Sequence, residues 1–428
     1  MVTDILFDDV MVLGHHYPFW VGPTAETYLE GEVAVIAAHA KRVYAVAFEG
    51  MWNGAPLRRH LPDNVEPIML TGEELSLDES WRRRLPQMRS LFTEEFLLDR
   101  SKVDGRDRLR AFFSFMRDSE KLSEVALRRV RERCPSFGSG RTLLYSFWFN
   151  EPSRAAILMA ERMCRETGRK PVVISRAHGY DCYDYRSDVG YLPCKAWMAL
   201  HQDRVYPCSW NGAEHLRKGN PRAASCFEVG YLGTLEGGLG PVPSKEDPLL
   251  VATCSRAVPL KRLDRVAAAL GLLASRGVGF RWFCIGDGET LSPLKEQVER
   301  LDIADSVEFL GALEQDEVFS FYRNTPLDVF VNASEVEGVP LSIMEAQSFG
   351  VPAVATAVGG NPEIVLEGVT GCLVPVDFSD GQLAEALLRA AARDSPSLRE
   401  GARRNWENRF SLERNADALL RAAVGFVK

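Results

Sequence analysis

The chain contains Glu337-Gly-Val-Pro-Leu-Ser-Ile-Met-Glu345-Ala-Gln-Ser-Phe-Gly-Val-Pro352, a pattern that predicts a loop leading into a helix. The apolar run at 328–332, just upstream, is typical of a buried strand. Residues 335–340 are therefore expected at the carboxyl end of that strand, where ligands bind in open α/β sheets. The stretch predicts a parallel α/β sheet with a binding site at this loop.

The start of the predicted helix is suited to an anion. The backbone N–H groups of Gly338, Val339 and Leu341 are expected to point outward there, where unpaired donors and aligned peptide dipoles favour negative charge. Glu337 and Glu345 can accept hydrogen bonds from hydroxyls on either side of that anion. A nucleotide sugar has this layout of sugar, diphosphate and ribose.

A second candidate for anion binding lies upstream. The apolar strand expected at 249–254 is followed by Ser255 and Arg256, and Lys261 is expected to open an amphipathic helix. Two cations between a strand and a helix suit phosphate oxygens, because each charge-assisted contact is worth roughly 1.5–3 kcal/mol.

These motifs, with Gly286-Asp-Gly288 and Gly359-Gly-x-Pro-Glu363 between and after them, resemble the donor half of the family 4 retaining glycosyltransferases of GT-B fold. The resemblance covers roughly residues 249–375. It implies two Rossmann-like domains whose parallel sheets face an interdomain cleft. Within the family the chain is most similar to bacterial capsule and exopolysaccharide biosynthesis glycosyltransferases.

The resemblance also implies roles for residues. Arg256 and Lys261 are expected to hold the donor diphosphate, Glu345 the ribose, and Glu337 the transferred sugar. Backbone groups near Gly311 and Leu313 are expected to meet the base. The full set of expected donor-binding residues is Gly22, Gly286, Gly311, Leu313, Gly338, Val339, Leu341, Ser342 and Glu345.

The N-terminal half carries weaker signals. Residues 14–22, followed by Glu26, are similar to the opening of the capsule and exopolysaccharide transferases, although Gly22 has no adjacent glycine. His178 follows the strand expected at 171–175; it is either a catalytic residue facing the cleft or a structural histidine with satisfied hydrogen bonds. The residues expected on the acceptor side are Glu26, Arg176 and Asp181.

The order of elements predicts two domains. An acceptor-side domain at 1–240, with a helical insertion near 80–135, precedes a donor-binding domain at 241–410. The Gly- and Pro-rich stretch 231–248 is expected to link them. The resemblance implies that residues 411–428 form a helix that packs back on the first domain. The strands expected lie at or near 10–14, 42–48, 65–70, 141–146, 171–175, 249–254, 280–285, 307–310, 328–332 and 352–356.

Composition excludes several classes of protein. A net charge of −8 argues against nonspecific nucleic-acid binding. No apolar run approaches the ~20 residues of a membrane span, and the nine cysteines form no C-x-x-C pair, which together predict a cytoplasmic protein in a reducing compartment. The histidines show no metal-ligand spacing, so no metal and no cofactor are expected beyond a nucleoside diphosphate sugar as co-substrate.

The basic region at 81–135 has two interpretations. Its interleaved acids fit a solvated helical insertion with pairs at i and i+4. Alternatively, Trp81, Arg82, Arg83 and Arg84 dock on the inner face of a membrane near a polyprenyl-linked acceptor.

These observations predict a retaining hexosyltransferase that acts on a cell-surface glycan or a polyprenyl-linked acceptor. A phosphorylase or a nucleotide-sugar epimerase of the same fold, or a non-catalytic nucleotide-sugar-binding protein, remains the alternative. A Rossmann dehydrogenase is disfavoured, because Gly286-Asp-Gly288 lacks the third glycine of the dinucleotide motif.

Overall fold

The computed structural model describes residues 4–20, 26–48, 55–57, 61–75, 90–244, 246–391 and 397–427. Backbone contacts divide the chain into two compact units. Unit 1 comprises Met1–Tyr231 and Glu413–Lys428, and unit 2 comprises Leu232–Leu412. The domain boundary expected at residue 240 lies inside unit 2, which begins at Leu232. The Gly- and Pro-rich stretch 231–248, which was expected to link the domains, therefore belongs almost entirely to unit 2.

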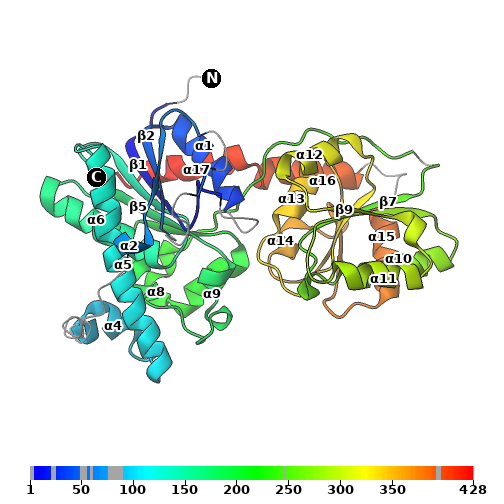
Figure 1. Cartoon of the computed structure of the whole chain (residues 1–428), viewed down its shortest axis with the longest axis horizontal. Helices are drawn as coiled ribbons and strands as arrows, with labels where there is room; N and C mark the ends of the chain where they lie inside the picture. Colours follow the sequence, from blue (N-terminus) through cyan, green and yellow to red (C-terminus); the bar gives the residue numbers. More distant parts are fainter. Residues whose placement is uncertain are drawn as a thin grey trace. The chain divides into compact units, whose positions relative to one another are not determined.

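Each unit is built on one six-stranded parallel sheet. Figure 1 shows helices packed around the strands of each unit. The strand orders are β3-β2-β1-β4-β5-β6 in unit 1 and β12-β11-β10-β7-β8-β9 in unit 2. The predicted α/β class with two parallel sheets is confirmed. The strands are β1 (Phe7–Gly14), β2 (Ala40–Ala47), β3 (Val65–Met69), β4 (Thr142–Ser146), β5 (Val172–Ala177), β6 (Arg204–Pro207), β7 (Leu249–Cys254), β8 (Phe280–Ile285), β9 (Val307–Gly311), β10 (Val329–Asn332), β11 (Ala353–Thr356) and β12 (Gly371–Val374).

Both sheets have the same topology. In each, the second and third strands extend in one direction from the first strand, and the fourth, fifth and sixth extend in the other direction. The direction reverses between β1 and β4 in unit 1 and between β7 and β10 in unit 2. In open α/β sheets, ligands bind at the carboxyl ends of the two strands that flank such a reversal.

Two layers of helices cover the sheet of unit 1, because its strands are apolar on both faces. Met11 and Leu13 pack with α5 and α6 on one face, and Val10 and Val12 pack with α1 and α17 on the other. The α-helices of the described part of this unit are α1 (Thr27–Ala38), α2 (Gly72–Leu75), α4 (Glu94–Asp99), α5 (Arg106–Arg133), α6 (Glu151–Thr167), α7 (Gly179–Cys182), α8 (Lys195–His201), α9 (Trp210–Gly219) and most of α17 (Leu412–Val424).

Unit 2 has the same three layers. Helices α10, α11 and α15 cover one face of its sheet, and α12, α13 and α16 lie on the other (Figure 1). Phe349, after α13, packs against Phe319 and Tyr322 of α12. The helices are α10 (Leu263–Ser275), α11 (Leu291–Arg300), α12 (Gln315–Asn324), α13 (Leu341–Ser348), α14 (Asn361–Ile364), α15 (Asp380–Ala390) and α16 (Ser397–Arg409).

Helix α17 completes the core of unit 1. Its buried residues Leu419, Leu420 and Ala423 belong to the same apolar cluster as the strands β1 and β4. His39, which follows α1, places its Nε2 3.0 Å from the Asp417 carboxylate and fastens the helix on its polar side.

The region expected as a helical insertion holds α4 and the long helix α5 in its described part. The arginines of α5 lie beside acids of the same unit. Arg129 contacts Glu74 at 2.7 Å, Arg131 contacts Glu166 at 2.8 Å and Arg133 contacts Glu66 at 2.6 Å. The other face of α5 is apolar, and Phe112, Phe115 and Val130 are buried in the same cluster as Met11 and Leu13 of β1. The solvated insertion expected here is therefore wrong for α5, which is a core helix with an ion-paired outer face. Residues 81–84 lie outside the described residues. Among the helices that the structure describes, none is both long and apolar enough to span a bilayer.

Two close backbone contacts require glycine at the turns of unit 2. A Cβ on Gly286, whose φ is +128°, would lie 1.8 Å from the Ser255 carbonyl oxygen. A Cβ on Gly359 would lie 2.1 Å from the Glu337 carbonyl oxygen. The turn after β8 therefore packs directly on the end of β7, and the turn after β11 packs directly on the loop after β10.

We expect Gly286→Ala to lower the melting temperature of unit 2 far more than Gly311→Ala does. Both glycines have positive φ, but a Cβ on Gly311 has no atom within 4 Å. Gly311→Ala should cost about 1–2 kcal/mol for the left-handed backbone, and Gly286→Ala adds a clash with backbone. Thermal unfolding followed by circular dichroism measures both. Equal shifts for the two variants would contradict the packing described here.

Candidate functional site

The carboxyl ends of the six parallel strands of unit 2 lie at one edge of its sheet. Cys254 of β7 pairs with Ile285 of β8, which pairs with Gly311 of β9. Beyond the strands, the Ser255 N–H donates to the Ile285 carbonyl at 3.0 Å and the Gly286 N–H donates to the Gly311 carbonyl at 2.7 Å. The edge therefore brings Gly286 beside the end of β7 and Gly311, one strand farther along, beside Gly286.

Glu337 lies at the centre of a polar cluster on this edge. Its Oε1 accepts from Lys261 Nζ at 2.5 Å, from Ser334 Oγ at 2.6 Å and from Asn332 Nδ2 at 3.0 Å. The Glu337 side chain is only 9% exposed and that of Lys261 19%. The structure thus joins the two motifs that the sequence placed about eighty residues apart. Lys261 lies in a short turn before α10 and not in the helix itself.

The loop that carries Glu337 is supported from below. The Thr356 hydroxyl donates to the Ser334 carbonyl at 2.6 Å, and Asn361 Nδ2 donates to the Thr356 carbonyl at 2.9 Å. The Gly360 N–H donates to the Gly338 carbonyl at 2.7 Å. Residues of the Gly-Gly-x-Pro-Glu motif therefore stabilise the conformation of this loop through hydrogen bonds.

Helix α13 presents backbone donors at the same place. Pro340 is its N-cap residue and has no N–H. Among the described residues, the N–H groups of Gly338, Val339 and Leu341 have no acceptor. Three open donors at a helix start, next to the Lys261 ammonium, are suited to binding an anion.

Two arginines near the start of α10 differ in their surroundings. Arg256 is exposed, and no hydrogen bond or ion pair joins its guanidinium to any other described residue. Arg262 donates through Nε to the Ala333 carbonyl at 2.8 Å and stacks on Phe378. Arg262 thus ties α10 to the end of β10, and Arg256 is available to a ligand.

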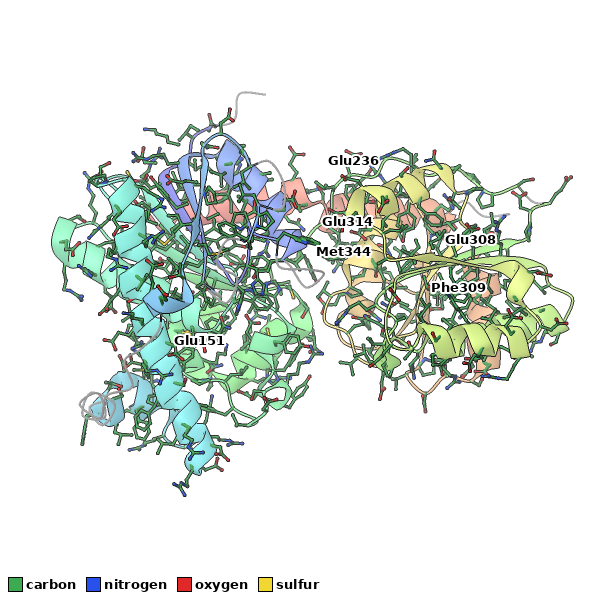
Figure 2. All side chains as sticks on the ribbon, viewed as in Figure 1. Glu151, Glu236, Glu308, Phe309, Glu314 and Met344 are labelled. Atoms are coloured by element: carbon green, nitrogen blue, oxygen red, sulfur yellow. The ribbon has the colours of Figure 1, made fainter. Side chains whose placement is uncertain are left out.

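Glu345 lies behind the loop, on α13. Its Oε1 accepts from Gln315 Nε2 of α12 at 3.2 Å. Burial raises the pKa of Glu345 to about 7, against the opposite effect of the Gln315 amide. Glu345 is therefore close to half-ionised at neutral pH. Glu314, the N-cap residue of α12, and Met344 of α13 mark these helices in Figure 2.

In unit 1, Glu26 supports the loop after β1. Its two oxygens accept from the N–H groups of His15 at 3.1 Å and of His16 and Tyr17, each at 2.9 Å, and from the Trp148 indole. Glu26 is 4% exposed. The carboxylate therefore holds the backbone of this loop, and its expected contact with an acceptor stays a prediction.

His178 and Asp181 form a reciprocal cap at the start of α7. The His178 ring accepts from the Asp181 N–H, and Asp181 accepts from the His178 N–H and from the Phe149 N–H at 2.6 Å. The other ring nitrogen of His178 lies 3.0 Å from the Phe147 carbonyl. Burial lowers the pKa of His178, although Asp181 opposes this effect, so the ring is neutral at pH 7. Both ring nitrogens thus have partners, which supports the structural interpretation of His178.

Arg176 has a position different from the one expected. It is 1% exposed, and its guanidinium contacts Glu32 and the Gly230 carbonyl. Tyr145 donates to Glu32 at 2.5 Å and accepts from Arg176 Nε at 3.2 Å. Arg176 therefore points into the core of unit 1 and away from the strand ends. Gly22 lies outside the described residues.

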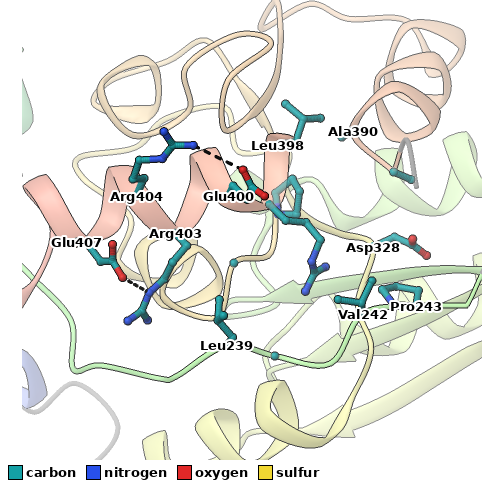
Figure 3. Close-up of a pocket in the computed structure, with 15 residues that line it drawn as sticks. Leu239, Val242, Pro243, Asp328, Ala390, Leu398, Glu400, Arg403, Arg404 and Glu407 are labelled. Atoms are coloured by element: carbon teal, nitrogen blue, oxygen red, sulfur yellow. Dashed lines mark hydrogen bonds and ion pairs between the residues drawn. The ribbon is translucent and has the colours of Figure 1, made fainter. Parts of the chain in front are cut away.

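A cavity of about 510 Å³ opens elsewhere in unit 2 (Figure 3). Asp328 and Pro352, which line it, precede β10 and β11. It therefore lies at the amino ends of the strands, opposite to the Glu337 cluster. Leu239, Val242 and Leu398 make much of its wall apolar.

Comparison with known families assigns the segment that carries the cluster. Residues 240–409 match the profile of one family, described as glycosyl transferases group 1. This segment belongs to that family. The family predicted from the sequence is confirmed for the part of the chain that holds Lys261, Glu337 and Glu345.

Two relatives of the chain are also named as glycosyltransferases. The chain is 30% identical over 258 residues to WcaL of Escherichia coli (strain K12), which is named for a glycosyltransferase of colanic acid biosynthesis. It is 34% identical over 208 residues to a D-inositol 3-phosphate glycosyltransferase of Actinosynnema mirum. These alignments cover 57% and 46% of this chain, and 63% and 48% of the relatives. The chain thus spans less than two thirds of either relative.

A solved structure shows the same fold. HepE from Anabaena, in complex with UDP, superposes with a TM-score of 0.61 at 15% identity and covers 98% of this chain and 100% of its own. At this identity the likeness concerns the fold alone. The predicted GT-B fold is confirmed.

Sequence reasoning missed several residues of the site. Asn332 and Ser334 hold Glu337, and Gln315 contacts Glu345. In unit 1, Trp148 contacts His15 and His178 at ring distances of 5.1 and 4.8 Å. Asn332, Ser334 and Trp148 could have been predicted, because each is a polar or aromatic residue within two positions of the end of a strand.

We expect Lys261→Ala to weaken binding of a nucleoside diphosphate about ten- to a hundredfold, because one charge-assisted contact of roughly 1.5–3 kcal/mol is lost. Binding of the matching nucleoside should not change, since Asn332 and Ser334 still hold Glu337. Isothermal titration calorimetry with both ligands measures the difference. Lys295→Ala, an exposed lysine of α11, serves as the control. Equal weakening of both ligands would assign Lys261 a folding role.

Glu345 predicts a dependence of stability on pH. The pKa is about 7 in the folded state and 4.5 without the fold, so the folded state keeps a proton that the unfolded state loses between these values. The free energy of unfolding should therefore fall as pH rises from 4.5 to 7, by on the order of 3 kcal/mol. Glu345→Gln should remove this loss, which denaturant unfolding at pH 5 and pH 8 measures.

Nucleoside affinity provides the second measurement on Glu345. The resemblance implies that ribose hydroxyls donate to the ionised Glu345 carboxylate, and on that expectation affinity rises with pH up to about 7 and then levels off. Gln315→Ala removes a hydrogen bond that lowers the pKa, so it should move this transition to higher pH. A wild-type affinity that does not vary with pH would place ribose elsewhere.

Proposed function

We propose that the protein is a retaining glycosyltransferase that moves a hexose-type sugar from a nucleoside diphosphate sugar to a cell-surface glycan or a polyprenyl-linked acceptor. The observation that carries this proposal is the cluster of Lys261, Asn332 and Ser334 around Glu337, next to three open N–H groups. It combines an anion site with a buried carboxylate, as a sugar diphosphate requires.

In this proposal, different residues bind different parts of the donor. Lys261, Arg256 and the N–H groups at the start of α13 meet the diphosphate. Glu345 meets the ribose and Glu337 the sugar. As the sugar departs, negative charge grows on the diphosphate, and fixed donors and cations stabilise that charge without reorganisation. The same cations make the reaction independent of a metal ion and of any cofactor.

The surroundings of Glu337 support retention without a covalent intermediate. One of its oxygens already accepts three hydrogen bonds, one of them from an ammonium. Such an oxygen is a weak nucleophile and a good partner for positive charge that develops on the sugar. We therefore propose that the acceptor attacks from the face that the diphosphate leaves.

The relatives support the class of donor and acceptor. HepE was solved with UDP, which makes a uridine diphosphate sugar the first donor to test. WcaL is named for colanic acid biosynthesis, which supports an exopolysaccharide acceptor. On the acceptor side, His178, Glu26 and Asp181 serve as positioning residues in this proposal, because each holds backbone near the ends of β1, β4 and β5. Membrane contact through Trp81 and Arg82–Arg84 is a further part of the proposal.

The experiment begins with a thermal-shift screen of uridine, guanosine, adenosine and thymidine diphosphate sugars. A ligand at 100 times its dissociation constant adds about 2.7 kcal/mol of stability, so the correct donor stands out. With that donor and a membrane extract as acceptor, we expect release of nucleoside diphosphate and transfer of labelled sugar in the presence of EDTA. Anomeric configuration is read by NMR of the product.

The variant Glu337→Gln provides the internal control. It should keep its affinity for the free nucleoside diphosphate and lose turnover, because its contact is made mainly in the transition state. A sugar phosphate or an epimer as product would assign one of the alternative activities. Loss of transfer in EDTA with rescue by manganese would overturn the role of Arg256 and Lys261.

A further inference from the structure

An aromatic side chain follows each of three neighbouring strands in unit 1. Strand β4 ends at Ser146 and is followed by Trp148; β5 ends at Ala177 and is followed by Tyr180; β6 ends at Pro207 and is followed by Trp210. The three strands are adjacent and parallel. The three aromatic residues, here called the aromatic row, therefore lie along one edge of the sheet.

The outer members of the row are open to solvent. Tyr180 is 73% exposed and Trp210 is 56% exposed. Trp148 is half-buried; its indole N–H is bound to Glu26 and its ring contacts His15 and His178. The row thus begins at the reversal of strand order between β1 and β4 and continues outward over β5 and β6.

Fixed polar and aromatic groups lie beside the row. The Tyr183 hydroxyl donates to Asn211 Oδ1 at 2.7 Å, which joins the segment after α7 to the first turn of α9. Tyr185, 70% exposed, lies with its ring 5.3 Å from that of Tyr183. This surface therefore carries both hydrogen-bonding groups and aromatic rings.

This combination is suited to a carbohydrate. The C–H face of a pyranose is apolar and packs on an aromatic ring, while its hydroxyls need hydrogen-bond partners at the ring edge. Because neighbouring strands are about 4.8 Å apart, the row spans roughly 10 Å, which is longer than a single pyranose. A single sugar would leave part of the row uncovered.

The charge beside the row argues against an anionic membrane as the occupant. The segment at 183–189 contains Asp184, Asp188 and one cation, Arg186, which stacks over Tyr183. Arg108, which donates to the Val189 carbonyl at 3.0 Å, is paired with Asp104. Binding to anionic lipid requires a cluster of basic residues. An uncharged or weakly charged glycan fits this balance.

We propose that Trp148, Tyr180 and Trp210 form a platform for more than one sugar residue of the acceptor, so that the protein prefers an oligosaccharide over a monosaccharide or a cyclitol phosphate. This inference rests on the proposed function and specifies its acceptor. Trp148, at the reversal of strand order, contacts the first sugar of this platform, and Tyr180 and Trp210 contact sugars farther along the glycan.

A glycan array that carries mono- to hexasaccharides of glucose, galactose, mannose and fucose tests the platform directly. We expect binding that strengthens with chain length. Tyr180→Ala and Trp210→Ala should each weaken oligosaccharide binding roughly three- to tenfold, the loss of one aromatic packing contact, and should not affect monosaccharides. Phe92→Ala is the matched control, since Phe92 is 86% exposed but follows no strand of the sheet.

Melting temperatures of the variants show whether each is folded, and both substituted side chains are exposed. Binding that does not depend on chain length, absence of glycan binding, or equal loss in Phe92→Ala would overturn the platform. Binding to vesicles with phosphatidylserine that depends on Trp210 would assign the row to lipid instead. If donor binding and donor hydrolysis persist while length dependence is absent, the platform fails and the proposed transferase activity does not.

Discussion

Parallel strands run in one direction, and that constraint brings the carboxyl ends of six strands to a single edge in each unit. The reversal of strand order between β7 and β10 then sends the following segments to opposite faces of the sheet. The gap that this leaves is where Lys261 and Glu337 meet, although they are far apart in the chain. The site therefore follows from the topology of the sheet, and Gly286 and Gly359 allow the turns around it to approach within backbone contact.

The ion pair of Lys261 and Glu337 has to meet two requirements: the buried carboxylate needs a partner, and the ammonium must be able to meet a phosphate. A buried carboxylate needs partners, because an unpaired charge away from water is costly, and Lys261, Asn332 and Ser334 provide them. A phosphate that approaches Lys261 competes with Glu337 for the ammonium. Asn332 and Ser334 remain bound to Glu337 during that exchange, so the carboxylate keeps its place. Glu345 meets the same problem differently, since its burial is relieved by taking up a proton.

Much of unit 2 was predictable because its strands are continuous apolar runs, as strands buried on both faces must be. The bounds expected for β7 and β8 agree with the structure. The short edge strands β6 and β12 were missing from the expected set: β6 contains Arg204 and Pro207, and β12 begins with a glycine. Such strands lack the long apolar run that the prediction relied on.

The acceptor side was less predictable for the same reason. A strand buried on both faces shows no alternation of polar and apolar residues, so its sequence does not tell which way Arg176 points. The structure turns it toward Glu32 in the core. Glu26 and Asp181 were expected at a ligand because they are acids near strand ends, yet both bind backbone N–H groups. Only the positions of those N–H groups distinguish the two roles, and these depend on tertiary structure.

The division of the chain has a consequence for its synthesis. Unit 2 is continuous in sequence from Leu232 to Leu412, whereas unit 1 requires residues from both sides of it. The apolar face formed by Val10, Val12 and their neighbours is covered in part by Leu419 and Leu420 of α17. On the ribosome, that face stays exposed until α17 is made, while unit 2 already has its whole sequence. The first half of the nascent chain is therefore the part whose exposed apolar face chaperones would protect. The second half can fold ahead of it.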